Sequence, residues 1–174
     1  MLRLITGPSG VGKTIITLKE ISLIKDRPKF ATPINCSGFS YKDHLLNELA
    51  HFSLWQNVPD ESLIFCDDAN KFIPFRDNKE PLEQWILDLA RHRHRSITSQ
   101  KSIDIYFTAL NPLLIDSYVR SLIEEHTHYY YASSEGLILS RTWPYCVNNP
   151  NNEKAFIDAQ AKYLKLSDFF SGVD

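Results

Sequence analysis

Short apolar runs alternate along this chain with longer segments in which apolar residues recur every three or four positions. The apolar runs predict strands, which cover residues 2–6, 30–36, 63–66 and 103–110. The run at 63–66 has no polar alternation, which is typical of a parallel strand covered on both faces. The helical spacing predicts helices over residues 13–24, 41–53, 81–92 and 113–124. Strands that alternate with helices predict an α/β fold on a mainly parallel sheet flanked by helices.

The last third of the chain has a different pattern. Apolar and aromatic runs at 127–133 and 137–145 flank a short Ser-Glu-Gly segment, which predicts a hairpin. An asparagine-rich turn at 148–152 precedes a predicted helix over 153–164. We therefore expect a small C-terminal hairpin and helix beside the sheet.

Composition limits the classes of protein to consider. With 174 residues the chain suits a single domain, for which we expect a core over about 1–145 and an extension over about 146–174. A net charge of −2 gives no global field that would attract nucleic acid or an anionic membrane. The three cysteines form no C-x-x-C pair, which suggests reduced thiols in a cytosol.

Membrane and secretion signals are not evident in the sequence. Only six residues precede the first glycine, too few for the apolar core of a secretory signal. No stretch approaches the roughly 18–20 consecutive apolar residues of a spanning helix. The sequence therefore predicts no transmembrane segment.

A glycine-rich motif lies between the first predicted strand and the first predicted helix. It matches the phosphate-binding pattern G-x-x-x-x-G-K-[ST] in full and consists of Gly7, Pro8, Ser9, Gly10, Val11, Gly12, Lys13 and Thr14. Backbone N–H groups of such a loop surround phosphates, and the following helix offers its positive N-terminal end. We expect Lys13 to reach the β- and γ-phosphates of ATP and Thr14 to bind Mg²⁺.

An acidic pair follows the buried strand at 63–66. Asp67 stands at the carboxyl end of that strand, where a carboxylate can hold Mg²⁺ as the Walker-B residue. Asp68 is the next residue and is suited to orient and activate a water for attack on the γ-phosphate. A solvated turn carboxylate is the alternative for Asp68.

Two further segments have candidate roles in hydrolysis. Asn111, after the strand at 103–110, could contact the γ-phosphate or the lytic water as a sensor, or could cap the next helix. Residues 91–95 read Arg-His-Arg-His-Arg. That cluster is a solvated face, a DNA-contacting loop, or the source of an arginine finger given to a neighbouring subunit. A zinc site from His92 and His94 would need further ligands that the nearby sequence does not supply.

The order of these motifs resembles the FtsK/HerA class of P-loop ATPases. Within that class it is most similar to small viral genome-packaging ATPases and to the zonula occludens toxin-like proteins that assemble filamentous phage. The resemblance covers most of residues 1–145. Its more distinctive parts are the segment 67–76, Asp-Asp-Ala-Asn-Lys-Phe-Ile-Pro-Phe-Arg, and Ala-Arg-His at 90–92 before Asp-Ile-Tyr-Phe-Thr-Ala-Leu-Asn at 104–111.

The resemblance implies a role for each matching residue. Lys13 and Thr14 would bind phosphate and Mg²⁺, and Asp67 would bind the metal. Asp68 would be the catalytic carboxylate and Asn111 the sensor. Arg91 is the first choice for the finger that acts in trans, and the alternatives that the likeness leaves open are Arg93, Arg95 and Arg120.

The resemblance also implies partners and a location. A homo-oligomeric ring would place each arginine against the next subunit's ATP and would contact DNA through its backbone. Viral capsid or assembly proteins would be further partners, in the host cytoplasm or the virion. The toxin-like proteins carry a transmembrane helix after the ATPase domain, and its absence from this sequence favours packaging over filamentous-phage extrusion.

Two other functions remain open from the sequence. A nucleoside monophosphate or small-molecule kinase has a similar glycine loop, but the segment 30–53 has no arginine for an acceptor site. A non-catalytic switch would use ATP to order a docking loop. Turnover of ATP separates the switch from the enzymes, and dependence on a phosphate acceptor identifies the kinase.

Overall fold

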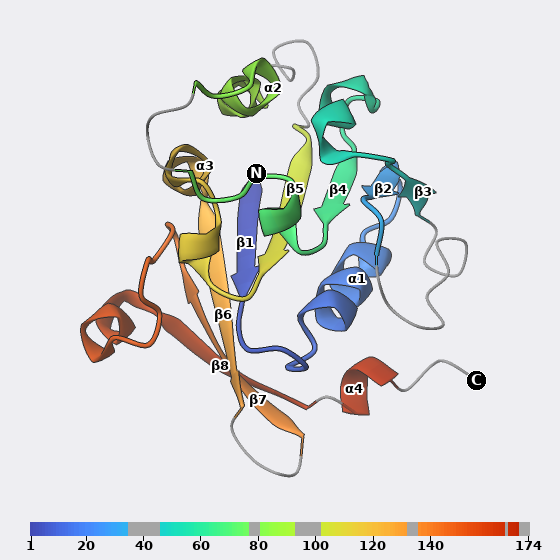
Figure 1. Ribbon diagram of the computed structural model, residues 1–174. Coiled ribbons are helices and arrows are strands. Elements are labelled where there is room, and N and C mark those ends of the chain that lie inside the picture. The colour runs from blue at the N-terminus through green and yellow to red at the C-terminus, as the bar shows by residue number, and fades with distance from the viewer. Residues whose placement is uncertain (35–45, 77–80, 93–101, 132–135, 166, 171–174) are drawn as a thin grey trace.

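In the part of the chain that the structure describes, the protein is built on one eight-stranded sheet with helices on both faces (Figure 1). The computed structural model describes residues 1–34, 46–76, 81–92, 102–131, 136–165 and 167–170. The strand order is β3-β2-β4-β5-β1-β6-β7-β8. The strands are β1 Leu2–Thr6, β2 Lys29–Ala31, β3 Asn47–Glu48, β4 Leu63–Cys66, β5 Asp104–Ala109, β6 Glu125–Tyr131, β7 Leu137–Trp143 and β8 Gln160–Lys165.

Parallel pairing joins the first six strands, and antiparallel pairing adds β7 and β8 at one edge. The α-helices are α1 Lys13–Leu23, α2 Gln84–Leu87, α3 Ser117–Leu122 and α4 Ser167–Phe170. Short 3₁₀ helices lie between them: η1 Phe52–Asn57, η2 Ala69–Lys71, η3 Asp88–Arg91, η5 Pro112–Leu114 and η6 Glu153–Asp158. The α/β class and the mainly parallel sheet are as predicted.

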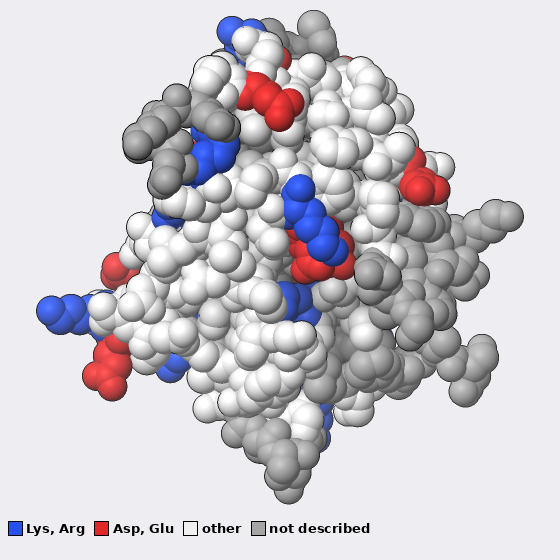
Figure 2. Space-filling model, viewed as in Figure 1, with Lys and Arg blue, Asp and Glu red and all other residues white. Residues whose placement is uncertain are grey.

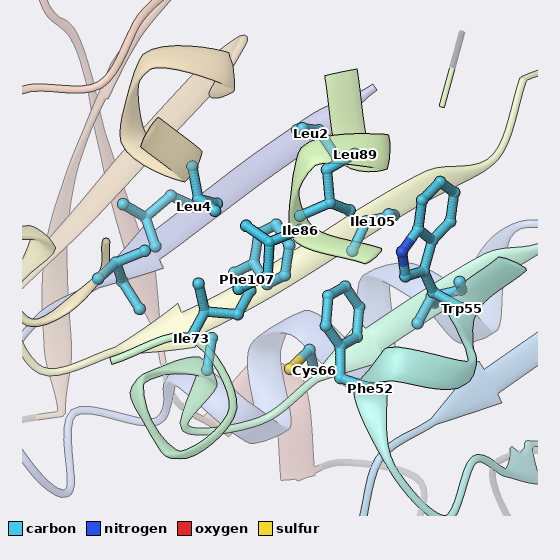
Figure 3. Close-up of a cluster of buried hydrophobic side chains, with 14 of the residues drawn as sticks. Leu2, Leu4, Phe52, Trp55, Cys66, Ile73, Ile86, Leu89, Ile105 and Phe107 are labelled. Atoms are coloured by element: carbon cyan, nitrogen blue, oxygen red, sulfur yellow. The ribbon is translucent and has the colours of Figure 1, made fainter. Parts of the chain in front are cut away.

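Strand β4 is buried on both faces of the sheet. Ile64 and Cys66 point into a cluster with residues of η1, α2 and β5, whereas Leu63 and Phe65 point into a second cluster beneath α1. Figure 3 shows the first cluster, in which the rings of Phe52 and Phe107 meet edge to face at 5.2 Å. A strand buried on both faces has no place for alternating polar residues, which explains the apolar run at 63–66.

The predicted helix over 41–53 is wrong in its described part. Residues 41–45 lie outside the described residues, and Asn47–Glu48 is strand β3, paired in parallel with β2. Leu46 and Leu49 are buried in different clusters because an extended chain directs them to opposite sides of the sheet. Helical structure begins only at Phe52, as 3₁₀ helix η1.

The predicted helix over 153–164 is also wrong. Helix η6 ends at Asp158, and Gln160–Lys165 forms β8 against β7. The six ladder pairs with β7 override the local helical spacing. The C-terminal part of the sheet is therefore three-stranded, and its only α-helix in the described residues is α4.

Three other predicted elements are shorter or divided. The helix over 113–124 is split into η5 and α3 because the Asp116 side chain accepts the Tyr118 N–H and starts a new helix. The helix over 81–92 begins at Gln84 and becomes 3₁₀ from Asp88, and β2 ends at Ala31.

In the described part of the chain, no helix has both the length and the apolar character needed to span a membrane.

The Phe107 ring of β5 should be a main contributor to stability because it is fully buried and packs against Phe52 of η1. We expect Phe107→Ala to lower the free energy of unfolding by about 3–5 kcal/mol in urea denaturation. Ile157→Ala removes a side chain that is 85% exposed and should change stability by less than about 0.5 kcal/mol. Equal effects of the two substitutions would contradict this assignment of the core.

Candidate nucleotide-binding site

The glycine loop connects β1 to α1 at the carboxyl edge of the parallel strands, as the sequence predicts. Gly7 has φ of 146°, and a Cβ there would lie 2.7 Å from the Tyr129 carbonyl oxygen. Gly12 has φ of 95° and precedes the first turn of α1. Both positions need glycine because the backbone is left-handed and, at Gly7, closely packed. The loop therefore presents the N-terminal end of an 11-residue helix to an anion.

Lys13 lies across this loop. Its side chain is buried, and its Nζ donates to the carbonyl oxygens of Gly7 at 2.9 Å and Pro8 at 3.0 Å. Burial lowers the pKa of Lys13, while the nearby Asp68 and Asp67 carboxylates act in the opposite direction. A phosphate in the loop would give this ammonium group a stronger partner than two carbonyls.

Asp67 connects three segments of the site. Its Oδ1 accepts hydrogen bonds from the Thr14 hydroxyl at 2.9 Å and the Thr108 hydroxyl at 2.7 Å. Its backbone N–H donates to Thr32 Oγ1 at 3.2 Å. Thr14 and Asp67 thus bring a hydroxyl and a carboxylate together, the oxygen ligands that Mg²⁺ prefers. The residues present fit a Mg²⁺ site that is completed by nucleotide phosphates.

Asp68 has an unusual backbone conformation. Its φ is 49°, in the left-handed region, and its N–H donates to Thr108 Oγ1 at 2.9 Å. Its Oδ2 lies 2.8 Å from Lys71 Nζ, and this hydrogen bond is the main cause of the raised pKa of Lys71. The Asp68 side chain is 44% exposed and so is accessible to solvent. Figure 2 shows a small acidic cluster at the centre of the visible face with basic side chains against it.

Sequence reasoning missed Thr32, Thr108 and Lys71. The threonines belong to strand ends that meet at the same edge of the sheet, which a linear reading cannot pair. The spacing of Asp68 and Lys71 is a local signal that could have been noticed, because a single 3₁₀ turn brings residues three apart together.

Asn111 adopts the capping role that the sequence left open. Its Oδ1 accepts the Leu113 N–H at 2.8 Å and begins η5. The residue also lines a cavity of about 410 Å³ with Pro8, His128 and Tyr130. A role of Asn111 as a sensor remains a prediction.

The candidate arginines lie in different surroundings. Arg91 is 76% exposed and forms an ion pair with Asp88 at 3.5 Å. Arg120 is held by the Ile115 carbonyl and by the Asn148 side chain. Arg93, Arg95 and His94 lie outside the described residues. His92 is buried against the Leu89 carbonyl and Glu124, and the described residues contain no group of three or more candidate metal ligands.

Two buried histidines lie directly beneath the phosphate loop. The Val147 N–H donates to His126 Nδ1 at 3.1 Å, so the proton of the neutral ring is on Nε2. That Nε2 donates to Thr6 Oγ1 at 2.6 Å, and the Thr6 hydroxyl donates to His128 Nδ1 at 2.7 Å. Burial lowers the pKa of His126 to about 3 and that of His128 to about 4, helped at His128 by Lys13.

These features define a class of protein. A phosphate loop between β1 and α1, with an aspartate at the end of a nearby parallel strand, is the arrangement of P-loop NTPases. The sheet and its flanking helices have the α/β fold of that class.

Comparison with known proteins gives a more specific likeness. No family model matches the chain. It is 28% identical over 164 residues to the putative assembly protein ORF301 of Pseudomonas phage Pf3, an alignment that covers 88% of this chain and 50% of that protein. The chain therefore spans about half the length of this curated relative.

Solved structures show the same fold. The N-terminal domain of zonular occludens toxin from Neisseria meningitidis matches with a TM-score of 0.72 and 24% identity, covering 95% of this chain and 93% of that one. The genome packaging NTPase B204 of Sulfolobus turreted icosahedral virus 2, in complex with ATP-gammaS, matches with a TM-score of 0.59 and 11% identity, covering 95% and 96%. The resemblance to toxin-like phage assembly proteins and viral packaging NTPases is thus confirmed.

The buried histidines predict acid sensitivity. Each binds a proton in the unfolded chain below about pH 6.5 but stays neutral in the folded protein, so their contribution to stability is present above that pH. We expect the free energy of unfolding to fall as the pH decreases from 6.5 toward about 4. Urea denaturation between pH 8 and pH 5 tests this above the range in which most carboxylates titrate. Histidine resonances that titrate near 6.5 for both rings would contradict it.

Proposed function

We propose that this chain is a Mg-ATP hydrolase that moves DNA during the assembly of a virus or phage particle. The observation that carries the proposal is the contact between Thr14 of the phosphate loop and Asp67, directly after β4, with Asp68 beside them. Genome packaging is the first form of this function. Filamentous-phage assembly and extrusion is the second, and the similarity to the Pf3 assembly protein favours it.

The residues divide the chemistry of hydrolysis among them. The backbone N–H groups of the loop and Lys13 bind the β- and γ-phosphates and hold the triphosphate in place. Thr14 and Asp67 would hold Mg²⁺, which would neutralise negative charge on the phosphates. Asp68 orients the attacking water and accepts its proton. Each role needs only residues that already lie within one edge of the sheet.

Arg91 is too distant to act on the ATP of its own subunit. Its neighbour His92 contacts Glu124, which precedes β6 at the amino edge of the sheet, and the phosphate loop follows β1 at the carboxyl edge. Figure 1 shows α2 and the phosphate loop at opposite ends of the central strands. An exposed arginine on that edge suits a ring in which it approaches the neighbouring subunit's ATP.

The ring also supplies the site for DNA. A net charge of −2 means that any contact with phosphates is local, through a basic segment such as 91–95, rather than through a global field. Such contacts follow the DNA backbone without reading bases. Capsid or assembly proteins would be the other partners, in the host cytoplasm or the virion.

A kinase and a non-catalytic switch are the competing functions. Asp68 next to the metal-binding carboxylate favours hydrolysis over both, because transfer to a bound acceptor does not need a residue that activates water. Phosphate release without an added acceptor separates hydrolysis from the other two.

Replacement of Asp68 tests the hydrolysis step. We expect Asp68→Asn to reduce phosphate release by about 10²–10⁴-fold because the amide cannot accept a proton from water. Binding of a fluorescent ATP analogue should persist, whereas Lys13→Ala should lose it. Glu153→Gln, a charge change on the exposed η6, serves as a control. Native turnover in Asp68→Asn would exclude Asp68 as the catalytic carboxylate.

A mixing experiment tests action in trans. Arg91→Ala and Lys13→Ala subunits should each be inactive alone, because one lacks the finger and the other lacks the phosphate site. When mixed, a Lys13→Ala subunit can offer its arginine to the intact ATP site of an Arg91→Ala neighbour, so turnover should partly return. DNA and higher protein concentration should increase it. Full activity of Arg91→Ala alone would leave nothing to recover on mixing. That result would refute a shared site that depends on Arg91.

A further inference from the structure

The side chain of Thr108 makes contacts to both acidic residues of the site. Thr108 is the residue before the last of β5 and is fully buried. Its hydroxyl donates to Asp67 Oδ1 at 2.7 Å and accepts the Asp68 N–H at 2.9 Å. A hydroxyl has one proton and two lone pairs, so both contacts can exist at the same time.

The first contact determines which oxygen of Asp67 is available. Oδ1 accepts from both Thr108 and Thr14, and a carboxylate oxygen has about two lone-pair sites. Oδ1 is therefore saturated by the protein. No hydrogen bond to Oδ2 is seen from the described residues, which leaves Oδ2 for a metal ion or its bound water.

The second contact supports the backbone at Asp68. A non-glycine residue with φ of 49° is in a conformation that L side chains adopt rarely, and it persists only where its surroundings hold it. The bond from the Asp68 N–H to Thr108 is such a restraint, since it connects the turn after β4 to the neighbouring strand. In this conformation the Asp68 carboxylate is 44% exposed and lies 2.8 Å from Lys71 Nζ.

We propose that Thr108 is a positioning residue for the metal and for the attacking water. It holds the Asp67 carboxylate so that Oδ2 faces the metal position, and it holds Asp68 in the conformation that presents its side chain. The proposal rests on the proposed ATP hydrolysis and assigns a function to a residue on β5 that acts through Asp67 and Asp68. Thr32 contacts Asp67 in a different way, because its Oγ1 accepts the backbone N–H of Asp67.

The test compares Thr108→Val with Thr108→Ser. Valine keeps the shape of threonine but cannot donate to Asp67 or accept from Asp68, whereas serine keeps the hydroxyl. The control is Thr127→Val, which removes a hydroxyl from β6 that is paired with Thr142. Manganese binding to the protein with a non-hydrolysable ATP analogue is measured by electron paramagnetic resonance, and phosphate release is measured against Mg²⁺ concentration.

We expect Thr108→Val to weaken manganese binding and to reduce turnover by about 10–100-fold, the usual effect of removing a partner of a metal ligand. Binding of nucleotide without metal should be unchanged. Thr108→Ser should behave like the native chain, and so should Thr127→Val. Should the valine variant unfold in a thermal scan, Thr108→Ala replaces it in the same comparison.

Two results would overturn the proposal. One is native manganese binding and native Mg²⁺ dependence in Thr108→Val. The other is a serine variant as impaired as the valine variant, because the hydroxyl would then not be the cause. Failure of the native chain to release phosphate from ATP is a separate result, which refutes the proposed function itself.

Discussion

The Asp67 carboxylate is the point on which the site depends. Its Oδ1 accepts hydrogen bonds from Thr14 at the start of α1 and Thr108 near the end of β5, and Asp67 itself directly follows β4. Three segments far apart in the sequence are thus fixed relative to one another by two short hydrogen bonds. Parallel pairing makes this possible, because it places the carboxyl ends of β4, β5 and β1 at one edge of the sheet.

The layer beneath the phosphate loop supports the same edge from the other side. Thr6, the last residue of β1, is hydrogen bonded to two histidines of β6 that burial keeps neutral. A charged ring there would repel Lys13 and compete for buried hydrogen bonds. The neutral network therefore adds no positive charge next to Lys13.

The two edges of the sheet carry different candidate residues. The carboxyl edge holds the described residues proposed to bind phosphate, metal or water, whereas the exposed Arg91 belongs to the amino edge. In the proposed ring, a subunit would offer its ATP site at one edge and its arginine to a neighbour at the other.

The sequence determined the parts of the site that are local. A glycine loop between a strand and a helix, and an aspartate directly after a buried apolar strand, are set by backbone conformation and burial within a few residues. For the same reason β1, α1, β4 and the β6–β7 pair were predicted with small errors at their ends.

The tertiary structure decided whatever depends on partners distant in the sequence. Strands β3 and β8 exist because they pair with β2 and β7, against the helical spacing of their own residues. The positions of Thr32, Thr108 and the two histidines beneath the loop were decided in the same way. The spacing of apolar residues shows only whether a segment by itself favours a helix or a strand. A hydrogen bond between strands depends instead on the register of the whole sheet.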